Sequence, residues 1–259
     1  MSNSFVLVPH WPSMPKNVAA LSTTRCGGFS TGAYDDGRGG GGFNLGLHCG
    51  DDTATVYRNR ERLQHLLPGQ PAWLSQVHGP DVADAAKVVG GEPARADASI
   101  ATERGVVCAI MTADCLPVLF ADTAGKVVGA AHAGWRGLAA GVLGETVRAM
   151  RGRGAGDIVA WMGPAIGPSR FEVGQDVLDA FVLAGLGEEG AVRKCFATHP
   201  ANAGKYLADI YALARIALAG EGVLDVAGGA HCTYTERETF YSYRRDHVTG
   251  RQATLVWLR

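Results

Sequence analysis

VVCAIMTADCLPVLFAD, residues 106–122, consists of two apolar runs separated by a short segment that holds an acid and a thiol. Each run has the length and the apolar, partly β-branched composition of a buried strand. Between them Asp114 stands directly before Cys115, and Pro117 follows. We therefore predict two buried strands joined at a corner that carries a carboxylate and a thiol.

The sequence on both sides of this stretch predicts a single domain of the α+β or mixed α/β class. No GxGxxG motif links a strand to a helix, so a nucleotide-binding doubly wound fold is not expected. No internal repeat is evident, and 259 residues suffice for one large core. Strand patterns lie at 4–9, 18–25, 72–133 and 253–258, and helical patterns at 51–67, at 134–152, from about Gly174 onward and at 203–222.

Charge and composition are those of an ordinary globular enzyme. The chain has 24 basic and 25 acidic residues, and 47% of its residues are hydrophobic. Binders of nucleic acid or of membrane surfaces usually carry a basic excess, so neither partner is expected. No apolar run is long enough to span a bilayer, and the first residues lack a secretory signal pattern. We expect a cytoplasmic protein whose six scattered cysteines are reduced thiols.

Three segments place a metal-binding or nucleophilic side chain at the end of a predicted element. SQVHGPDV puts His78 before a Gly-Pro pair, TADCLP puts Cys115 at the corner, and GAAHAGWRG puts His132 just before a helix. Functional side chains are often displayed at such element ends. Two imidazoles and one thiolate form a three-ligand set, which for zinc is typical of a catalytic site with an open fourth position.

The same residues admit two other chemistries. A thiolate nucleophile with a histidine base would suit a cysteine hydrolase, in which Asp114 orients the imidazole. In a zinc site Asp114 would instead support a ligand or act as the general base on bound water. Copper is the other option, with Met111 or Met162 as a loose additional ligand. A multicopper laccase is excluded, because the eight histidines include no HxH pair.

Arginines and aromatic residues near these segments are candidate substrate contacts. A fixed guanidinium beside a helix start or a glycine turn can hold a phosphate or carboxylate, as Arg136, Arg170 and Arg25 would. Trp135 and Phe171 have side chains that stack on planar bases. The structural alternatives are surface ion pairs for the arginines and core packing for the aromatics.

Taken in order, these motifs resemble the laccase-domain, YfiH-like family, once labelled multicopper polyphenol oxidoreductases. TADCLP and HAGWRG are the most specific of them. The resemblance implies an α+β fold of mixed sheets packed as a sandwich with flanking helices, as in a deamidating bacterial toxin that uses a Cys–His pair. The matching segments cover nearly the whole chain: TTRCGGFSTGAY, FNLGLHCGDD, NRERL, WLSQVHGPDV, ADASIATERGVVCAIMTADCLPVLFAD, GAAHAGWRGLAAGVL, WMGPAIGPSRFEVG and DIYALAR.

The resemblance also implies the activity. It points to a purine nucleoside phosphorylase that acts on adenosine, inosine, guanosine and methylthioadenosine, yields base plus ribose 1-phosphate, and also deaminates adenosine. It implies zinc bound by His78, Cys115 and His132. An alternative known among bacterial relatives is an amidase that edits peptidoglycan precursors, with Cys115 as the nucleophile. The expected partners are therefore small molecules, and nothing in the sequence sets the oligomeric state.

Roles for the surrounding residues follow from this chemistry. Zinc would activate water for attack on C6 of adenine while Asp114 shuttles protons to the leaving ammonia. Arg136 or Arg170 would hold phosphate against the ribose, and Arg25 is a further substrate-binding candidate. The amide of Asn44 in FNLG is a candidate contact to the purine or ribose. Its alternative is a turn residue that bonds its own backbone.

Three features depart from the family pattern. Residues 35–42, DDGRGGGG, look like a local insertion, and we expect a flexible loop there because glycines have no side chains to pack. Arg170 stands where the family varies, which weakens the case for its role. Cys49 replaces what is commonly a valine, and it receives no role.

Overall fold

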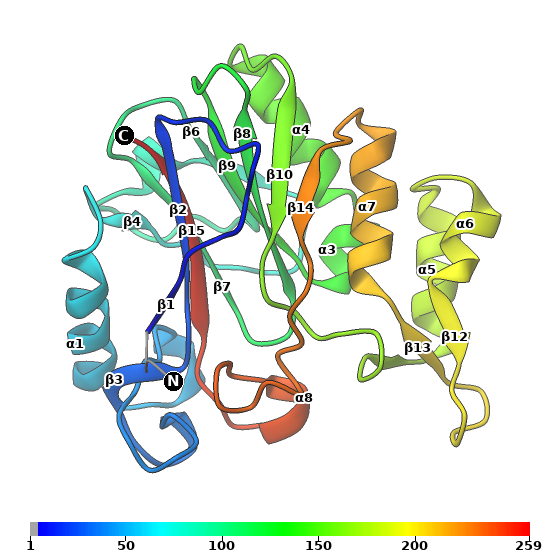
Figure 1. Ribbon diagram of the computed structural model, residues 1–259, viewed down its shortest axis with the longest axis horizontal. Helices are drawn as coiled ribbons and strands as arrows, with labels where there is room; N and C mark the ends of the chain where they lie inside the picture. Colours follow the sequence, from blue (N-terminus) through cyan, green and yellow to red (C-terminus); the bar gives the residue numbers. More distant parts are fainter. Residues whose placement is uncertain (1–4) are drawn as a thin grey trace.

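The computed structural model describes residues 5–259, in which two β-sheets stack between outer helices (Figure 1). The five-stranded sheet has the order β1 (Val6–Leu7), β2 (Val18–Thr23), β15 (Gln252–Leu258), β7 (Val107–Thr112) and β4 (Pro71–Ala72). The six-stranded sheet has the order β14 (Val226–Gly228), β10 (Ile158–Met162), β8 (Leu116–Asp122), β9 (Val128–Ala133), β6 (Ala98–Ala101) and β5 (Val82–Asp84). A small third sheet contains β11 (Glu172–Val173), β13 (Tyr206–Ala208) and β12 (Phe196–Thr198).

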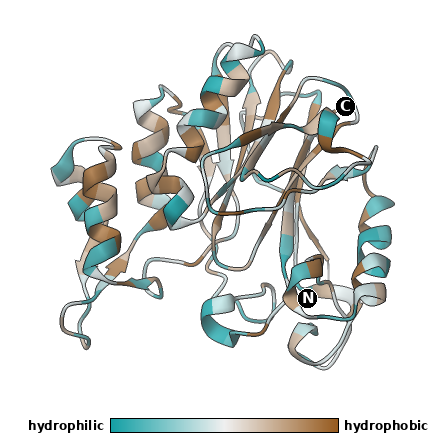
Figure 2. Cartoon of the chain, turned by 180° about the vertical axis from the view of Figure 1, so that it is seen from behind, coloured by the Kyte–Doolittle hydropathy of each residue, from teal (hydrophilic) through white to brown (hydrophobic). Residues whose placement is uncertain are grey.

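Helices cover the outer faces of the two large sheets, and a further pair packs against the small third sheet. Their exposed sides are hydrophilic and their inner sides apolar, as the colouring of Figure 2 shows. The helices are α1 (Thr53–Gln64), α2 (Ala85–Val88), α3 (Trp135–Ala139), α4 (Val142–Gly152), α5 (Gln175–Ala184), α6 (Glu189–Lys194), α7 (Ile210–Gly220) and α8 (Tyr243–Asp246). The remaining elements are the short strand β3 (Cys26–Ser30) and two 3-10 turns, Gly32–Tyr34 and Leu47–Cys49.

Alternate residues of the central strands enter different apolar layers. On β7, Ile110 faces the layer between the two sheets and Ala109 faces the layer beneath α1. On β8, Leu119 faces the layer between the sheets and Phe120 faces the layer under α4 and α7. Strands buried on both faces are continuous apolar runs rather than alternating ones, which explains the composition of residues 106–122. The predicted class, mixed sheets in a sandwich with flanking helices, is confirmed.

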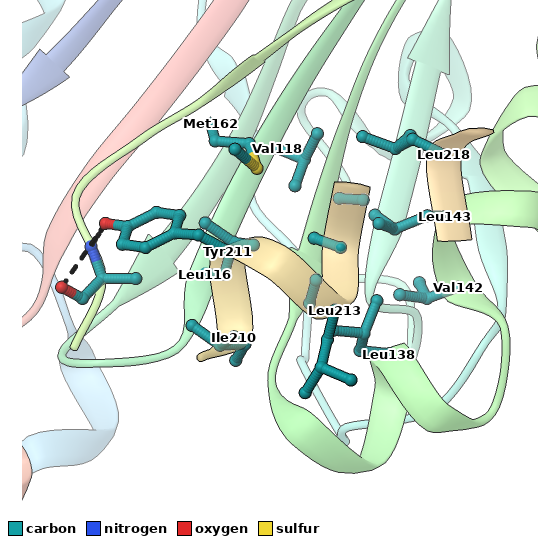
Figure 3. Packing of buried hydrophobic residues seen from close by; sticks show 14 of the residues in the cluster. Leu116, Val118, Leu138, Val142, Leu143, Met162, Ile210, Tyr211, Leu213 and Leu218 are labelled. Atoms are coloured by element: carbon teal, nitrogen blue, oxygen red, sulfur yellow. Dashed lines mark hydrogen bonds between the residues drawn. The ribbon is translucent and has the colours of Figure 1, made fainter. Parts of the chain in front are cut away.

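The layer between the six-stranded sheet and the helices is shown in Figure 3. Val118 and Met162 of the sheet pack there with Leu213 of α7 and with side chains from α3 and α4. The hydroxyl of Tyr211 accepts a hydrogen bond from the backbone N–H of Ala165 at 2.7 Å, so the phenol is satisfied within the core. This packing fixes the end of the sheet on which the strand corner lies.

The corner itself crosses from one sheet to the other. β7 pairs with β15 in the five-stranded sheet, whereas β8 pairs with β9 and β10 in the six-stranded one. Between them Asp114 has a φ of 95°, which is unusual for a residue other than glycine. The predicted corner is thus confirmed, and its backbone is strained at the acid.

Two predicted helices are wrong in their extent. The helix predicted at 134–152 is two helices, α3 and α4, because Gly141 between them adopts a left-handed φ of 89°. The segment predicted as a helix at 203–222 begins as strand β13. Its helix α7 starts only after Asp209, whose side chain accepts from the N–H of Ala212 as an N-cap. The helix predicted at 51–67 is present as α1, capped by Asp52.

The remaining sequence expectations concern loops, thiols and the chain start. All six cysteines are free thiols. In the glycine-rich segment Asp36 accepts from the N–H groups of Arg38 and Gly40, and the mobility expected of residues 35–42 stays a prediction. Residues 1–4, which include the start of the first strand pattern, lie outside the described residues. None of the helices between residues 5 and 259 has the length and apolarity needed to cross a bilayer.

Candidate active site

The fold brings His78, Cys115 and His132 together. Their ligand atoms all lie within 4.8 Å of one another, and Sγ of Cys115 is 3.7 Å from Nε2 of His78. A tetrahedral zinc ion with bonds of about 2.3 Å to sulfur and about 2.0 Å to nitrogen holds such atoms about 3.6 Å apart. The three side chains therefore fit a single tetrahedral metal ion with one position open to solvent or substrate.

Strand register explains why two of these residues meet. Cys115 immediately precedes β8, and His132 lies at the end of β9, where it is paired with Pro117. Adjacent antiparallel strands place such residues side by side at one edge. His78 arrives from the loop between β4 and β5, with a left-handed φ of 62°. The cluster is thus built at the end of the sandwich from two sheet strands and one loop.

A buried acid, Asp97, holds the backbone at His78 and the ring of His132. Its carboxylate accepts hydrogen bonds from the N–H groups of Val77, His78 and Gly79 at 2.8–3.0 Å. It also bonds Nδ1 of His132 at 2.7 Å, which leaves Nε2 of that ring for the cluster. Burial raises the pKa of Asp97, but hydrogen bonds from His132, Gly79 and Val77 outweigh it and lower the pKa to about 2. Asp97 is therefore an anion at neutral pH.

Asp97 was not predicted from the sequence, although a signal was present. The residue stands in ARADASIA, an acid just before a buried strand. A charged residue that is 0% exposed is rare unless it is paired. An acid entering an apolar run near two candidate ligand histidines is therefore a recognisable sign of a ligand-orienting carboxylate.

Cys115 and His132 shift each other's pKa toward the charged forms, the thiolate and the imidazolium. Burial raises the pKa of the Cys115 thiol, but the His132 charge and hydrogen bonds from His132 and His78 lower the pKa to about 6. Burial lowers the pKa of His132, but Cys115 and Asp97 raise it to about 9. At neutral pH the thiolate, the form that binds metal or attacks a carbonyl, is thus already present.

Gly134 in HAGWRG leaves room for this cluster. A Cβ atom at this position would lie 2.8 Å from Cδ2 of His78 and 3.0 Å from Sγ of Cys115. Any side chain here would displace two of the three candidate ligands. Gly134 is therefore required by the space that the ligands occupy rather than by the backbone turn before the helix.

Two cavities meet at the cluster. The larger, of about 620 Å³, extends along β7 and the loop before His78, and the smaller, of about 290 Å³, extends toward α3 and α8. His78, Ala113, Cys115 and Tyr243 line both. Specific to the larger cavity are His48, Leu74, Ser75, Gln76, Met111, Thr112, His132 and Arg251. Specific to the smaller are Asp114, Trp135, Arg136, Ile166, Phe171, Ile210 and Arg244.

Asp114 lies beside the cluster, but both of its carboxylate oxygens are engaged. One accepts from the hydroxyl of Thr233 at 2.6 Å, and the other accepts from the backbone N–H of Arg244 at 2.7 Å. The second bond ties the start of α8, and with it Tyr243, to the strand corner. The proton-shuttle role stays a prediction, and the contacts favour a positioning role.

Asn44 and Arg25 do not reach either cavity. Asn44 is fully buried, and its Oδ1 accepts from the N–H groups of Gly46 and Arg251. Asn44 is therefore a turn residue that bonds nearby backbone, which was the alternative to a substrate contact. Its bond to the N–H of Arg251 also fixes that residue. Arg25 donates to the carbonyl of Asp35 and lies 5.0 Å from the ring centre of Tyr241. Their predicted substrate contacts therefore have no support in the described geometry.

The other two predicted arginines differ from each other. Arg136 lines the smaller cavity, with its guanidinium 4.2 Å from the ring centre of Trp135. Arg170 lies over the ring of Tyr234 at 5.3 Å and lines neither of the two cavities. Of the arginines predicted to contact substrate, the structure brings only Arg136 to the site.

Several residues of the cavity walls were also not predicted from the sequence. Gln76 donates to the carbonyl of Met111 and accepts from its N–H, so its amide pairs with β7 as a neighbouring strand would. His48 lies far in the sequence from Tyr243 and Arg251, and no local motif marked any of the three. Only the chain fold brings these residues beside the cluster.

Comparisons with known proteins show which chains this one resembles. Residues 19–259 match the family model described as multi-copper polyphenol oxidoreductase laccase. The purine nucleoside phosphorylase YfiH of Shigella flexneri is 52% identical over 98% of this chain and 99% of its own length. The purine nucleoside phosphorylase PA4543 of Pseudomonas aeruginosa is 50% identical over 98% of each chain. The crystal structure of Neisseria meningitidis protein NMB0706 has a TM-score of 0.89 and 49% identity, covering 98% of this chain and 99% of that one.

Proposed function

The chain belongs to the multi-copper polyphenol oxidoreductase laccase family, and from this membership and its site we propose that it is a zinc-dependent purine nucleoside phosphorylase. In this reaction hydrogen phosphate attacks C1′ of the ribose, the C1′–N9 bond breaks, and the phosphate proton passes to the purine. The products are ribose 1-phosphate and the free base. We include adenosine, inosine, guanosine and methylthioadenosine as substrates, and deamination of adenosine as a second activity.

The observation that carries this proposal is the three-ligand cluster at the meeting point of two cavities. A nucleoside placed across it puts its sugar next to His78 and Cys115. The aromatic residues Trp135 and Phe171 in the smaller cavity suit a planar purine. The names of the relatives, purine nucleoside phosphorylases at 50–52% identity, support the same reaction class.

Zinc is the metal that we propose, because the chain offers a poor copper site. A blue-copper centre needs a methionine sulfur near its two histidines and cysteine. The sulfur of Met111 accepts from Arg60 at 3.8 Å, and Met162 packs in the core against Val118 and Tyr211 (Figure 3). When bound, zinc supplies Lewis-acid polarisation and activates water at neutral pH.

The protein's own residues hold the reacting groups. Asp97 fixes the imidazole of His132 and the backbone at His78, so the substrate meets a preorganised cluster. Tyr243 lines both cavities and is positioned to cover the sugar. Arg136 lies at the smaller cavity, where its charge can face the departing purine.

Product analysis with adenosine tests the proposal. With phosphate, the purified zinc-loaded protein is expected to release adenine together with ribose 1-phosphate. Without phosphate, it is expected to release inosine and ammonia and no adenine. If adenine appears equally with and without phosphate, the phosphorylase assignment is wrong. If no inosine forms, the deaminase activity is absent.

A second candidate is a cysteine-type amidase that edits peptidoglycan precursors. It is favoured by the thiolate of Cys115, the raised pKa of His132 and the acid Asp97 behind that histidine, which together match a nucleophile, a proton donor and an orienting group. Alkylation of a metal-free preparation distinguishes the two. Amide cleavage that persists after chelation and is lost on alkylation supports the amidase, whereas activity lost on chelation and restored by zinc supports the phosphorylase.

A further inference from the structure

The larger cavity has a basic end formed by His48 and Arg251, with Arg60 behind them. His48 and Arg251 line the cavity, whereas Arg60 contacts the lining residue Met111 from the far side. The backbone of Arg251 is held by Asn44, whose Oδ1 accepts from the Arg251 N–H at 2.8 Å. Its Nη1 donates to the carbonyls of Thr249 and Gly250. Hydrogen bonds therefore fix the guanidinium of Arg251 at this end of the cavity.

The positive charge at this end is not neutralised within the protein. Within residues 5–259 neither Arg251 nor Arg60 forms a salt bridge, and Nε and Nη2 of Arg251 have no hydrogen-bond partner. The nearby acid Asp51 is engaged by Ser30 and by Asn44. Arg251 thus has donors available at this end of the cavity, and Arg60 adds a second positive charge behind it.

Electrostatic effects on neighbouring groups agree with this description. Partial burial and the charges of Arg251 and Arg60 lower the pKa of His48, so both guanidiniums act on that ring. Burial lowers the pKa of Arg60 to about 10, which is the sign of a cation desolvated without an anion beside it. An anion bound at this end would remove the repulsion between these groups.

We propose that Arg251 and His48 form the phosphate subsite of this enzyme, with Arg60 as a supporting charge. The inference rests on the proposed function and assigns phosphate to the larger cavity rather than to Arg136 or Arg170. Arginine offers paired N–H donors that match phosphate oxygens, and Arg251 has two such donors free.

The position of this subsite fits the stereochemical demand of phosphorolysis. The attacking oxygen and the departing purine must lie on opposite sides of C1′. The two cavities meet at His78, Cys115 and Tyr243, so a sugar there has one cavity on each side. Phosphate at Arg251 and a purine beside Trp135 then approach C1′ from different cavities. Arg136, which lies on the purine side, is misplaced for the nucleophile.

The subsite is tested with inorganic phosphate and single variants of the zinc-loaded protein. Binding is measured by calorimetry at constant ionic strength, and the KM values for phosphate and for inosine are measured separately. Arg251→Gln is expected to weaken phosphate binding and raise the phosphate KM about 30-fold, because a hydrogen-bonded charge is lost. The KM for inosine is expected to change less than about 3-fold.

Three further variants make the result decisive. His48→Gln is expected to weaken phosphate binding about 5-fold. The His48 side chain makes no hydrogen bond within residues 5–259, so this variant tests the subsite even if Arg251→Gln disturbs the turn around Arg251. Arg136→Gln is expected to leave phosphate binding unchanged. Arg193→Gln, a surface residue paired with Glu189 on α6, controls for the loss of one positive charge.

The outcomes separate this inference from the proposed function. Normal phosphate binding in both Arg251→Gln and His48→Gln, or its loss in Arg136→Gln, overturns the subsite. If ribose 1-phosphate still forms in that case, the phosphorylase assignment stands without it. If phosphate binds through Arg251 but no ribose 1-phosphate forms from any nucleoside, the anion site stands and the phosphorylase assignment is wrong.

Discussion

At the scale of single residues, Asp97 connects the loop of His78 to the strand of His132. Four donors converge on one buried carboxylate, three from successive backbone N–H groups and one from an imidazole. Carboxylates in this position fix the tautomer and orientation of ligand histidines. The geometry of the cluster therefore depends on a residue that does not itself belong to it.

Replacement of this acid tests that dependence. Asp97→Asn is expected to weaken zinc binding about 10- to 100-fold, because the amide supplies no negative charge to His132. Competition with a chromophoric chelator measures the affinity. Glu189→Gln, which removes an exposed acid on α6, is the matched control. Unchanged zinc affinity in Asp97→Asn contradicts the orienting role.

Asp97 also gives metal-free protein a specific pH dependence. Its pKa is lowered to about 2 in the folded state, against about 3.9 in an unfolded chain. Its stabilising contribution is therefore complete above pH 4 and is lost as pH falls from about 4 toward 2. Urea unfolding of wild type and Asp97→Asn across this range is expected to show a stability difference that shrinks with falling pH. A constant difference would argue against the lowered pKa.

Asp114 has two candidate roles, positioning of α8 and proton shuttling, and they predict different effects of substitution. If it positions α8, Asp114→Asn and Thr233→Val are expected to impair turnover similarly and to keep the wild-type pH profile. An amide offers one acceptor oxygen to the two donors that Asp114 holds, and valine has no hydroxyl to donate. If Asp114 shuttles protons, only Asp114→Asn alters the profile. The measurement is kcat and kcat/KM for adenosine deamination as a function of pH. We expect the first outcome, since both oxygens are already engaged.

At the scale of elements, the start of α3 presses Gly134 against two of the ligands. Gly134→Ala is expected to weaken zinc binding at least about 10-fold, because the added methyl group lies 2.8 Å from the His78 ring. Gly152→Ala at the end of α4, where a Cβ meets no atom within 4 Å, is the matched control and is expected to keep zinc affinity. Zinc titration of both variants is the measurement, and equal affinity contradicts the steric argument.

Elements were predictable where one local signal decided them. The two strands of residues 106–122, the helix α1 and the final strand follow from composition and caps. The division of 134–152 was not predictable, because Gly141 is one glycine among several and only the tertiary packing of α3 selects it as the break. The short strands β11, β12 and β13 depend on one another and carry too few residues for a pattern.

At the scale of the whole molecule, the site is a product of the sandwich. β7 and β8 belong to different sheets, so the corner between them lies where both sheets end. The C-terminal strand β15 runs between β2 and β7, which ties Arg251 just before it to the same end (Figure 1). The three ligands were predictable because each stands in a short sequence motif beside the end of a predicted element. Arg251 and His48 were not, because their proximity exists only once the sheets have formed.

The central claim is that nucleoside chemistry takes place at the His78–Cys115–His132 cluster. The direct measurement is release of ribose 1-phosphate from inosine and phosphate by wild type and by Cys115→Ala, both supplied with the same excess of zinc and shown to be folded by thermal unfolding. Wild type is expected to form the product, to lose the activity on chelation and to regain it with zinc. Cys115→Ala is expected to lose at least about 100-fold in rate. Undiminished product formation by Cys115→Ala would contradict the account.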